Sequence, residues 1–203
     1  MKYCLSLLFL IILSSCKGPT PEASTVQEEK ASVVADSAQM IVERAIAIHG
    51  GDIIKNSLIE FDFRQFHFKA TRRGASFTYE RIFQDSTGRH IRDILTNANF
   101  QREINGSAVP LSPKDSAAYS NSVNSVIYFA LLPYFLNDRA VRKTYLGIST
   151  IKGQPYYKIS VTFGSEGGGK DFQDEYAYWF HRDQGTMDYL AYNYQVDGGS
   201  PVP

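Results

Sequence analysis

The sequence predicts an α+β fold: a mostly antiparallel β-sheet that forms a curved half-barrel, with an N-terminal helix and an inserted kinked helix packed on one face. Three observations predict it. Segments of alternating apolar and polar residues are joined by short polar turns, which is typical of antiparallel sheets. A segment with apolar residues at helical spacing precedes them, and a second helical segment, which contains Pro133, divides the strands into two groups.

The N-terminus has the pattern of an export signal. The stretch MKYCLSLLFLIILSSC has a lysine near its start and an apolar run from Leu5 to Leu13. This run is shorter than the roughly 20 apolar residues that a membrane-spanning helix needs, and it ends in small residues. We therefore expect residues 1–15 to be a signal peptide and the protein to be exported.

The end of this segment, Leu13-Ser14-Ser15-Cys16, resembles the lipobox of bacterial lipoproteins. The resemblance implies that acyl chains on Cys16 anchor the mature protein in a membrane, since stable anchoring takes more than one chain. Lys17 rather than Asp follows the cysteine, which by analogy with lipoprotein sorting implies the outer membrane. We expect the protein on its periplasmic face.

A tether and a first helix follow the anchor. Residues 16–32 are rich in Pro, Ser, Thr and Glu and have almost nothing apolar to bury, so we expect a flexible tether. Residues 33–203 are expected to form a single domain. Its apolar residues from Val34 to Ile48 recur at helical spacing up to Gly50-Gly51, which predicts an amphipathic helix with a glycine cap.

The first group of strands is predicted to be an antiparallel meander of four. LIEFDFRQFHF (58–68) alternates, but the parity of its apolar residues slips by one near Arg64-Gln65, which predicts one long strand with a bulge. FTYERIF (77–83), RHIRDIL (89–95) and NFQREI (99–104) follow, with polar turns between them. The dipeptide Asn105-Gly106 predicts a hairpin.

The inserted helix and the second group of strands complete the domain. Ser112 is the expected cap of a helix with Pro113 at its first position, and Pro133 should kink or end that helix near Leu132. The predicted strands after it are AVRKTYLGI (140–148), PYYKISVTF (155–163), EYAYWFHRD (175–183) and MDYLAYNYQV (187–196).

The segment GSEGGGKD (164–171) fits part of the phosphate-binding motif G-x-x-x-x-G-K. However, Asp171 stands where the motif needs Ser or Thr, and a strand pattern follows where the motif needs a helix. The acids Glu166, Asp171, Asp174 and Glu175 could hold calcium, but their spacing does not match an EF-hand loop. We therefore expect a hairpin connection without a metal.

Neither the charge nor the motifs indicate nucleic-acid binding or catalysis. The chain has 21 basic and 21 acidic residues and no basic cluster in the folded region, so we expect no nucleic-acid partner. The four histidines lack metal-ligand spacing, and no G-x-S-x-G elbow is present. Carboxylate pairs such as Glu60/Asp62 are routine on the polar face of a strand. We expect no enzyme, no cofactor and no metal.

The mature chain resembles an uncharacterised family of Gram-negative cell-envelope lipoproteins. The resemblance is carried by LIEFDFRQFHF, YFALLPYFLNDRAVRKTYLG and GQPYYKISVTFGSEGGGKDFQDEYAYWF. That family is similar in architecture to the lipoprotein carriers LolA and LolB, which implies a curved sheet wrapped around an apolar cavity for acyl chains. Related chains continue past DGGSPVP, which implies a chain truncated at its C-terminus.

The chain has 13 Phe and 13 Tyr, nearly all of them in the domain and more rings than one closed sheet face needs. They either pack the helices or line an apolar groove. In the second case we expect a non-catalytic binding module for a lipid or another apolar ligand, and the alternative is a structural lipoprotein that binds another envelope protein or a glycan. The candidate groove residues are Phe61, Phe63, Phe77, Tyr79, Phe83 and Trp179 on the sheet, covered by Phe129, Leu132 and Phe135.

Overall fold

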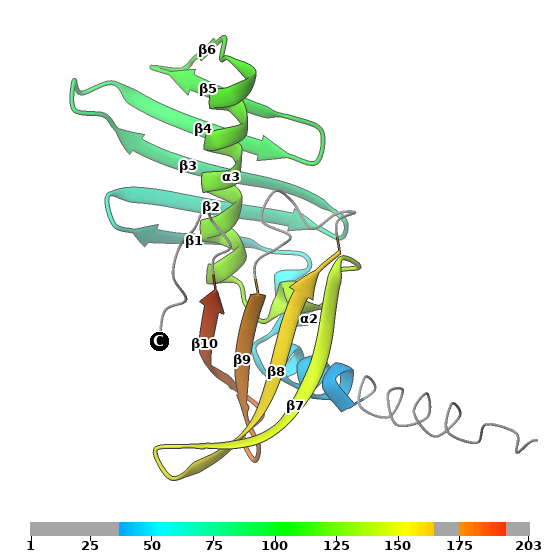
Figure 1. The fold of residues 1–203 in the computed structure, drawn as a ribbon. Coiled ribbons are helices and arrows are strands. Elements are labelled where there is room, and N and C mark those ends of the chain that lie inside the picture. The colour runs from blue at the N-terminus through cyan, green and yellow to red at the C-terminus, as the bar shows by residue number, and fades with distance from the viewer. Residues whose placement is uncertain (1–36, 165–174, 194–203) are drawn as a thin grey trace, which may run out of the picture.

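The computed structural model describes residues 37–164 and 175–193. The predicted α+β fold is confirmed: within this part of the chain, two antiparallel sheets that do not close into a barrel pack against helices (Figure 1). The predicted signal peptide, Cys16 and the predicted tether lie outside the described residues. The elements are α2 Gly51–Ile54, β1 Leu58–Phe63, β2 Phe66–Arg73, β3 Ser76–Gln84, β4 His90–Thr96, β5 Phe100–Ile104, β6 Ser107–Val109, α3 Pro113–Ala130, the 3-10 helix η1 Tyr134–Asn137, β7 Val141–Ile151, β8 Gln154–Phe163, β9 Glu175–His181 and β10 Met187–Asn193.

The first sheet contains six strands in chain order, β1 to β6, where four were predicted. Residues 58–68 are a hairpin and not one bulged strand, since β1 and β2 pair antiparallel with Phe63 opposite Phe66. Arg64 and Gln65 form the turn, and Arg64 has a φ of 57°. The slip in parity therefore marks a chain reversal. Phe63 and Phe66 pair across the hairpin and point to the same side of the sheet, and the two turn residues between them shift the apolar positions from odd to even numbers.

The sixth strand follows the hairpin that Asn105-Gly106 predicted. Asn105 and Gly106 have φ values of 50° and 79°, as the tight hairpin turns of antiparallel strands require. After this turn, β6 pairs with β5. Its three residues were too few to show an alternating pattern in the sequence.

Helix α3 begins as predicted and ends slightly earlier. The Ser112 hydroxyl accepts a hydrogen bond from the backbone N–H of Asp115 at 3.1 Å, and Pro113 is the first helical residue. The helix ends at Ala130, two residues before Leu132, and η1 follows Pro133. Figure 1 shows α3 lying across one face of the six-stranded sheet.

A row of charged residues under α3 fixes the helix on this sheet. Asp93 is fully buried and accepts hydrogen bonds from Nε of Arg81 at 2.9 Å and from Nε of Arg102 at 2.6 Å. The strand register places Asp93 directly opposite both arginines. Arg81 also donates to the Ser122 hydroxyl of α3 at 2.7 Å, and Arg102 lies 3.6 Å from the ring centre of Tyr119. We call Arg81, Asp93 and Arg102 the charged row.

The second sheet has the four predicted strands in the order β10, β9, β8, β7. Direct antiparallel pairing of β8 with β9 agrees with a hairpin connection between them, although residues 165–174 themselves lie outside the described part. The predicted first helix covers this sheet: residues 37–48 are helical, and Gly50 has the left-handed φ of 78° expected of a cap. Short helix α2 after it was not predicted.

Each sheet has its own hydrophobic core. In the six-stranded half, Phe68, Ala70 and Tyr79 pack against Val123 and Ile127 of α3. Tyr128 of α3 contacts both cores, so the C-terminal part of α3 joins the two halves. No helix within residues 37–164 and 175–193 has the length and apolar character that crossing a bilayer requires. The core of the four-stranded half contains Ala38, Val42, Ala45, Leu132, Leu136, Val141, Ile159, Val161, Tyr178 and Phe180.

Candidate functional site

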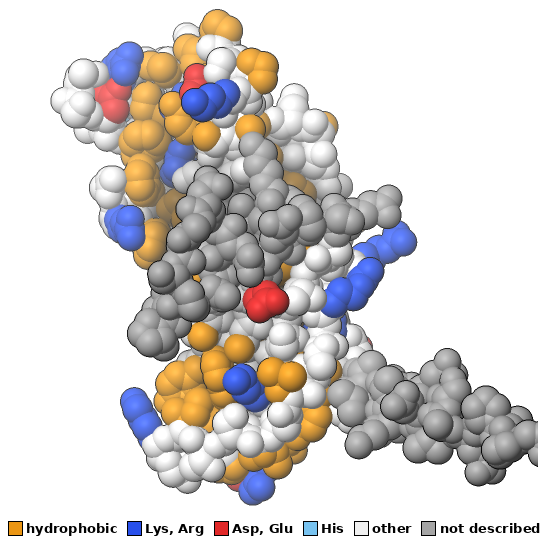
Figure 2. All heavy atoms as spheres, viewed as in Figure 1, with side chains coloured by type: hydrophobic (Ala, Val, Ile, Leu, Met, Phe, Trp, Pro, Cys, Tyr) orange, Lys and Arg blue, Asp and Glu red, His pale blue; other side chains and the backbone are white. Residues whose placement is uncertain are grey.

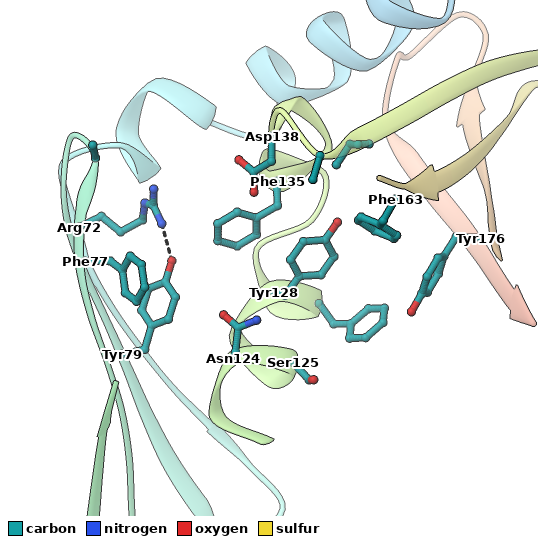
Figure 3. A pocket seen from close by; sticks show the side chains of 14 residues that line it. Arg72, Phe77, Tyr79, Asn124, Ser125, Tyr128, Phe135, Asp138, Phe163 and Tyr176 are labelled. Atoms are coloured by element: carbon teal, nitrogen blue, oxygen red, sulfur yellow. Dashed lines mark hydrogen bonds between the residues drawn. The ribbon is translucent and has the colours of Figure 1, made fainter. Parts of the chain in front are cut away.

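A cavity of about 410 Å³ lies where the two halves meet. One wall comes from β2 and β3, the opposite wall from β8 and β9, and the C-terminal part of α3 and the segment up to β7 lie between them (Figure 3). The cavity is therefore built from elements that are distant in sequence. It is lined by Arg72, Ala75, Phe77, Tyr79, Asn124, Ser125, Tyr128, Phe129, Phe135, Asp138, Ala140, Val141, Phe163 and Tyr176.

Aromatic rings form most of the apolar lining. Tyr128 stacks on Phe135 with ring centres 5.1 Å apart and also contacts Phe163 at 6.4 Å. Phe163 in turn meets the edge of Tyr176 at 5.7 Å. Figure 3 shows Phe163 and Tyr176 on the side of the cavity opposite Phe77 and Tyr79. Such rings provide a large apolar area at fixed positions, which suits the binding of an apolar chain by burial.

The end of the cavity formed by β2 and β3 is polar. The Arg72 guanidinium donates a hydrogen bond to the Tyr79 hydroxyl and lies over the rings of Tyr134 and Phe135 at 5.1 and 5.4 Å. The Nε of Arg72 is buried and has no hydrogen-bond partner. The hydroxyl of Tyr128 is likewise buried without a partner. A buried donor without a partner costs free energy, and two of the four such side-chain atoms found among the described residues, Arg72 Nε and the Tyr128 hydroxyl, belong to residues of this cavity.

Asp138, in the segment between η1 and β7, also lines the cavity. Partial burial raises its pKa, although the residue as a whole is exposed, while Arg72 and Lys143 act to lower it. Burial also raises the pKa of Tyr79 and of Tyr128, so both hydroxyls stay protonated at neutral pH. The polar end therefore combines a cation, a carboxylate and neutral hydroxyls.

The structure brings part of the predicted groove together. Phe77 and Tyr79 line the cavity from β3, Phe129 lines it from α3, and Phe135 lines it from η1. The first two stack with ring centres 4.3 Å apart. Their alternation along one strand face was the signal that identified them.

The other five predicted groove residues do not line the cavity, because each packs elsewhere in the fold. Phe61 stacks on Phe68 in the core of the first half, and Phe63 is exposed beside Arg64. Phe83 packs under Arg81. The remaining two belong to the second half, where Leu132 is in the core and Trp179 is on the outer face of the sheet with Lys158 over its ring.

Sequence reasoning missed most of the polar lining. Arg72 was assigned to a turn, whereas it lies within β2, which extends to Arg73. Tyr128 and Asp138 carried no signal, because neither belongs to a motif. Phe163 does share a strand face with Tyr157, Ile159 and Val161, so the alternation of β8 could have placed it on the inner side.

A second cavity of about 190 Å³ lies between the first helix and strands β8 and β9, lined by residues that include Met40, Tyr157 and Phe180. Within the described ranges, no group of three or more His, Cys, Asp and Glu side chains is placed to hold a metal ion. The acids Glu166, Asp171 and Asp174 lie outside those ranges.

Comparisons with known proteins place the chain in a family. No functionally curated protein matches the sequence. A similar solved structure is the lipoprotein LppX of Mycobacterium tuberculosis, with 9% identity, a TM-score of 0.32, and coverage of 81% of this chain and 98% of that one. This likeness is too weak to indicate a shared function. The model of DUF6503, a family of unknown function, matches residues 29–201, and the chain therefore belongs to that family.

Proposed function

We propose that this protein is a membrane-anchored lipoprotein of the cell envelope that binds a lipid or another apolar ligand in the cavity between its two sheets, without catalysing a reaction. The observation that carries the proposal is the open, aromatic-lined cavity of about 410 Å³. Its volume is within the range of about 300 to 1,000 Å³ that is typical of small-molecule sites. The Cys16 lipobox and Lys17 support the anchor and the outer membrane.

Burial alone could hold an acyl chain in this cavity. Each methylene transferred from water to an apolar site contributes roughly 0.8 kcal/mol, so a short chain already gains several kcal/mol. Phe163 and Tyr176 supply the apolar surface at the end away from Arg72 (Figure 3), and Phe129 adds to it with its ring centre 6.2 Å from that of Tyr176. A protein that carries or holds a lipid needs no reactive group, so the proposal requires no catalytic residue.

The test uses the full chain carrying Cys16→Ala. Lipid extracted from the purified protein with organic solvent should be identified by mass spectrometry, and binding of a fluorescent polyene fatty acid should be titrated. The native Trp179 is a poor reporter, because it lies on the outer face of the four-stranded sheet. An empty extract together with no binding of the probe would overturn the proposal.

A matched pair of variants on α3 locates the site. Asn124 lines the cavity, whereas Asn121 is exposed on the same helix and does not. Asn124→Trp should fill part of the cavity and abolish binding of the probe. Asn121→Trp should leave it unchanged. Equal binding by both variants would mean that the probe binds elsewhere.

A second candidate function rests on a different surface. On the outer face of the four-stranded sheet, Tyr189 pairs with Trp179 across the strands, and the ring of Tyr156, which is itself buried, supports Tyr189 with ring centres 5.4 Å apart. Lys158 lies 5.3 Å from the Trp179 ring centre. Rings with polar neighbours on a sheet face suit a glycan or another envelope protein. Crosslinking in intact cells discriminates the two functions: a single stable partner favours this surface, and recovery with lipid favours the cavity.

A further inference from the structure

The arginines of this fold differ in how their charge is compensated. Arg81 and Arg102 share the buried carboxylate of Asp93, and Arg92 pairs with Glu80 at 2.7 Å and with Glu103 at 3.3 Å. Arg72, which lies on the helix-covered face of the first sheet with Arg81 and Arg102, differs from them because it has no carboxylate partner in the described part of the chain. It donates to the Tyr79 hydroxyl, and no carboxylate of the described residues lies within 4.0 Å of its guanidinium.

This uncompensated cation lines the cavity and is half-buried. Its Nε is a buried donor without a partner. Taking a charge out of water is costly unless an opposite charge and hydrogen bonds replace the water. A ligand anion at this end of the cavity would supply both.

The hydroxyl of Tyr79 lies beside this guanidinium. Its oxygen accepts a hydrogen bond from Arg72, so its own proton remains available for a ligand oxygen. The Tyr128 hydroxyl is farther away, since the Phe135 ring lies between Tyr128 and Arg72 (Figure 3). A neutral donor beside a guanidinium is a favourable pair for an oxyanion.

Two charged side chains of the described residues line the cavity. Asp138 is the one carboxylate among the described lining residues, and it opposes an anion. Its charge acts on Arg72 and, more weakly, on Lys143, but it lies more than 4.0 Å from the Arg72 guanidinium and forms no ion pair with it. Within the described part of the chain, Arg72 is the one cation of the lining and is therefore the group that a ligand anion would meet. Away from it, the cavity wall is aromatic (Figure 3).

We propose that the ligand is a single-chain amphiphile with an acidic headgroup, carboxylate or phosphate, whose oxygens bind Arg72 and the hydroxyl of Tyr79 while its chain lies against Phe129, Phe163 and Tyr176. This inference rests on the proposed function, since it names the chemical class of ligand for the same cavity. Polarity along the cavity then sets the orientation of the ligand, with the head on the wall formed by β2 and β3 and the chain toward β8 and β9.

The experiment compares three probes with one chain length on the full chain carrying Cys16→Ala: dodecanoate, dodecyl phosphate and dodecanol, each below its micelle concentration. The unaltered cavity should bind the two acids at least about tenfold more tightly than the alcohol, which is the difference expected for charge-assisted hydrogen bonds. Whichever of the two acids binds more tightly identifies carboxylate or phosphate as the natural headgroup.

Variants separate the headgroup from the chain. Arg72→Met should remove the preference for acids and leave the affinity for dodecanol unchanged. Tyr79→Phe should reduce the preference partially, and it keeps the ring stack with Phe77. Arg73→Met is the matched control, because Arg73 is the next residue of β2 and is exposed on the opposite face. It should behave like the unaltered protein, and melting temperatures check that each variant is folded.

The outcomes distinguish the two proposals. If all three probes bind equally, or if Arg72→Met keeps the preference for acids, the headgroup assignment is wrong and the apolar cavity stands. If none of the probes binds, the proposed function itself fails.

Discussion

The two halves of this molecule bury different kinds of side chain under their helices. The six-stranded half places the charged row beneath α3, with Asp93 fully buried between two arginines. The four-stranded half packs an apolar core against the small residues Ala38, Val42 and Ala45 of the first helix. On the surface the two halves are more alike, since hydrophobic side chains are visible over both sheets (Figure 2). Fixed charges specify where α3 lies, whereas close packing specifies where the first helix lies.

The largest effect should come from breaking the charged row. Asp93→Ala leaves Arg81 and Arg102 buried without a carboxylate, which should lower the free energy of unfolding by about 4 kcal/mol. Urea denaturation measures it. Asp62→Ala is the control, because that side chain is 80% exposed and its loss should cost less than about 0.5 kcal/mol. Equal losses for the two variants would show that the row does not fix α3.

The apolar half should respond to lost volume instead of lost charge. Ile159 is fully buried in β8, so Ile159→Ala should lower the free energy of unfolding by about 3 kcal/mol through lost burial and the cavity it leaves. Ile148→Ala in β7 is the matched control, since that residue is 56% exposed. A small effect at Ile159 would mean that this core tolerates loose packing.

Substitution of a tyrosine in the four-stranded half should instead raise the free energy of unfolding. The hydroxyl of Tyr178 is buried without a hydrogen-bond partner, and burial, aided by Tyr128 and Tyr176, raises its pKa. Tyr178→Phe removes this unsatisfied group and should raise the free energy of unfolding by about 1 kcal/mol. Thermal unfolding at neutral pH measures the change. Destabilisation would contradict the assignment of the hydroxyl as unsatisfied.

The smallest effect concerns the junction of the halves. Because the pKa of Asp138 is raised in the folded state, its ionised form is disfavoured there at pH 7, so Asp138→Asn should stabilise the fold by about 0.3 kcal/mol, reduced by solvent screening. As the pH falls through the raised pKa and then below the unfolded value of 3.8, the carboxyl is protonated in both states and the difference should vanish. Unfolding curves of both proteins between pH 7 and pH 3 test this. A difference that persists at low pH would exclude the titration of Asp138 as its cause.

The sequence predicted the elements better than it predicted the site. Alternation and turn dipeptides placed most strands, since these signals are local, and the cap at Ser112 fixed the start of α3. The charged row could also have been found once the strands were aligned, because Arg81, Asp93 and Arg102 each interrupt an apolar face. The cavity could not have been found from the sequence, because Arg72, Tyr128 and Phe163 come together only when the two sheets are placed relative to each other.

The division of the strands into two sheets has a consequence for the breadth of what the protein can bind. Among the described residues, strand pairing is confined within each sheet, and the cavity lies at their junction. A small rotation of one sheet against the other would widen or narrow the cavity while every ladder of backbone hydrogen bonds stays intact. Under the proposed function, a cavity of this kind would accept chains that differ in thickness, unsaturation or branching, with the headgroup as the constant feature.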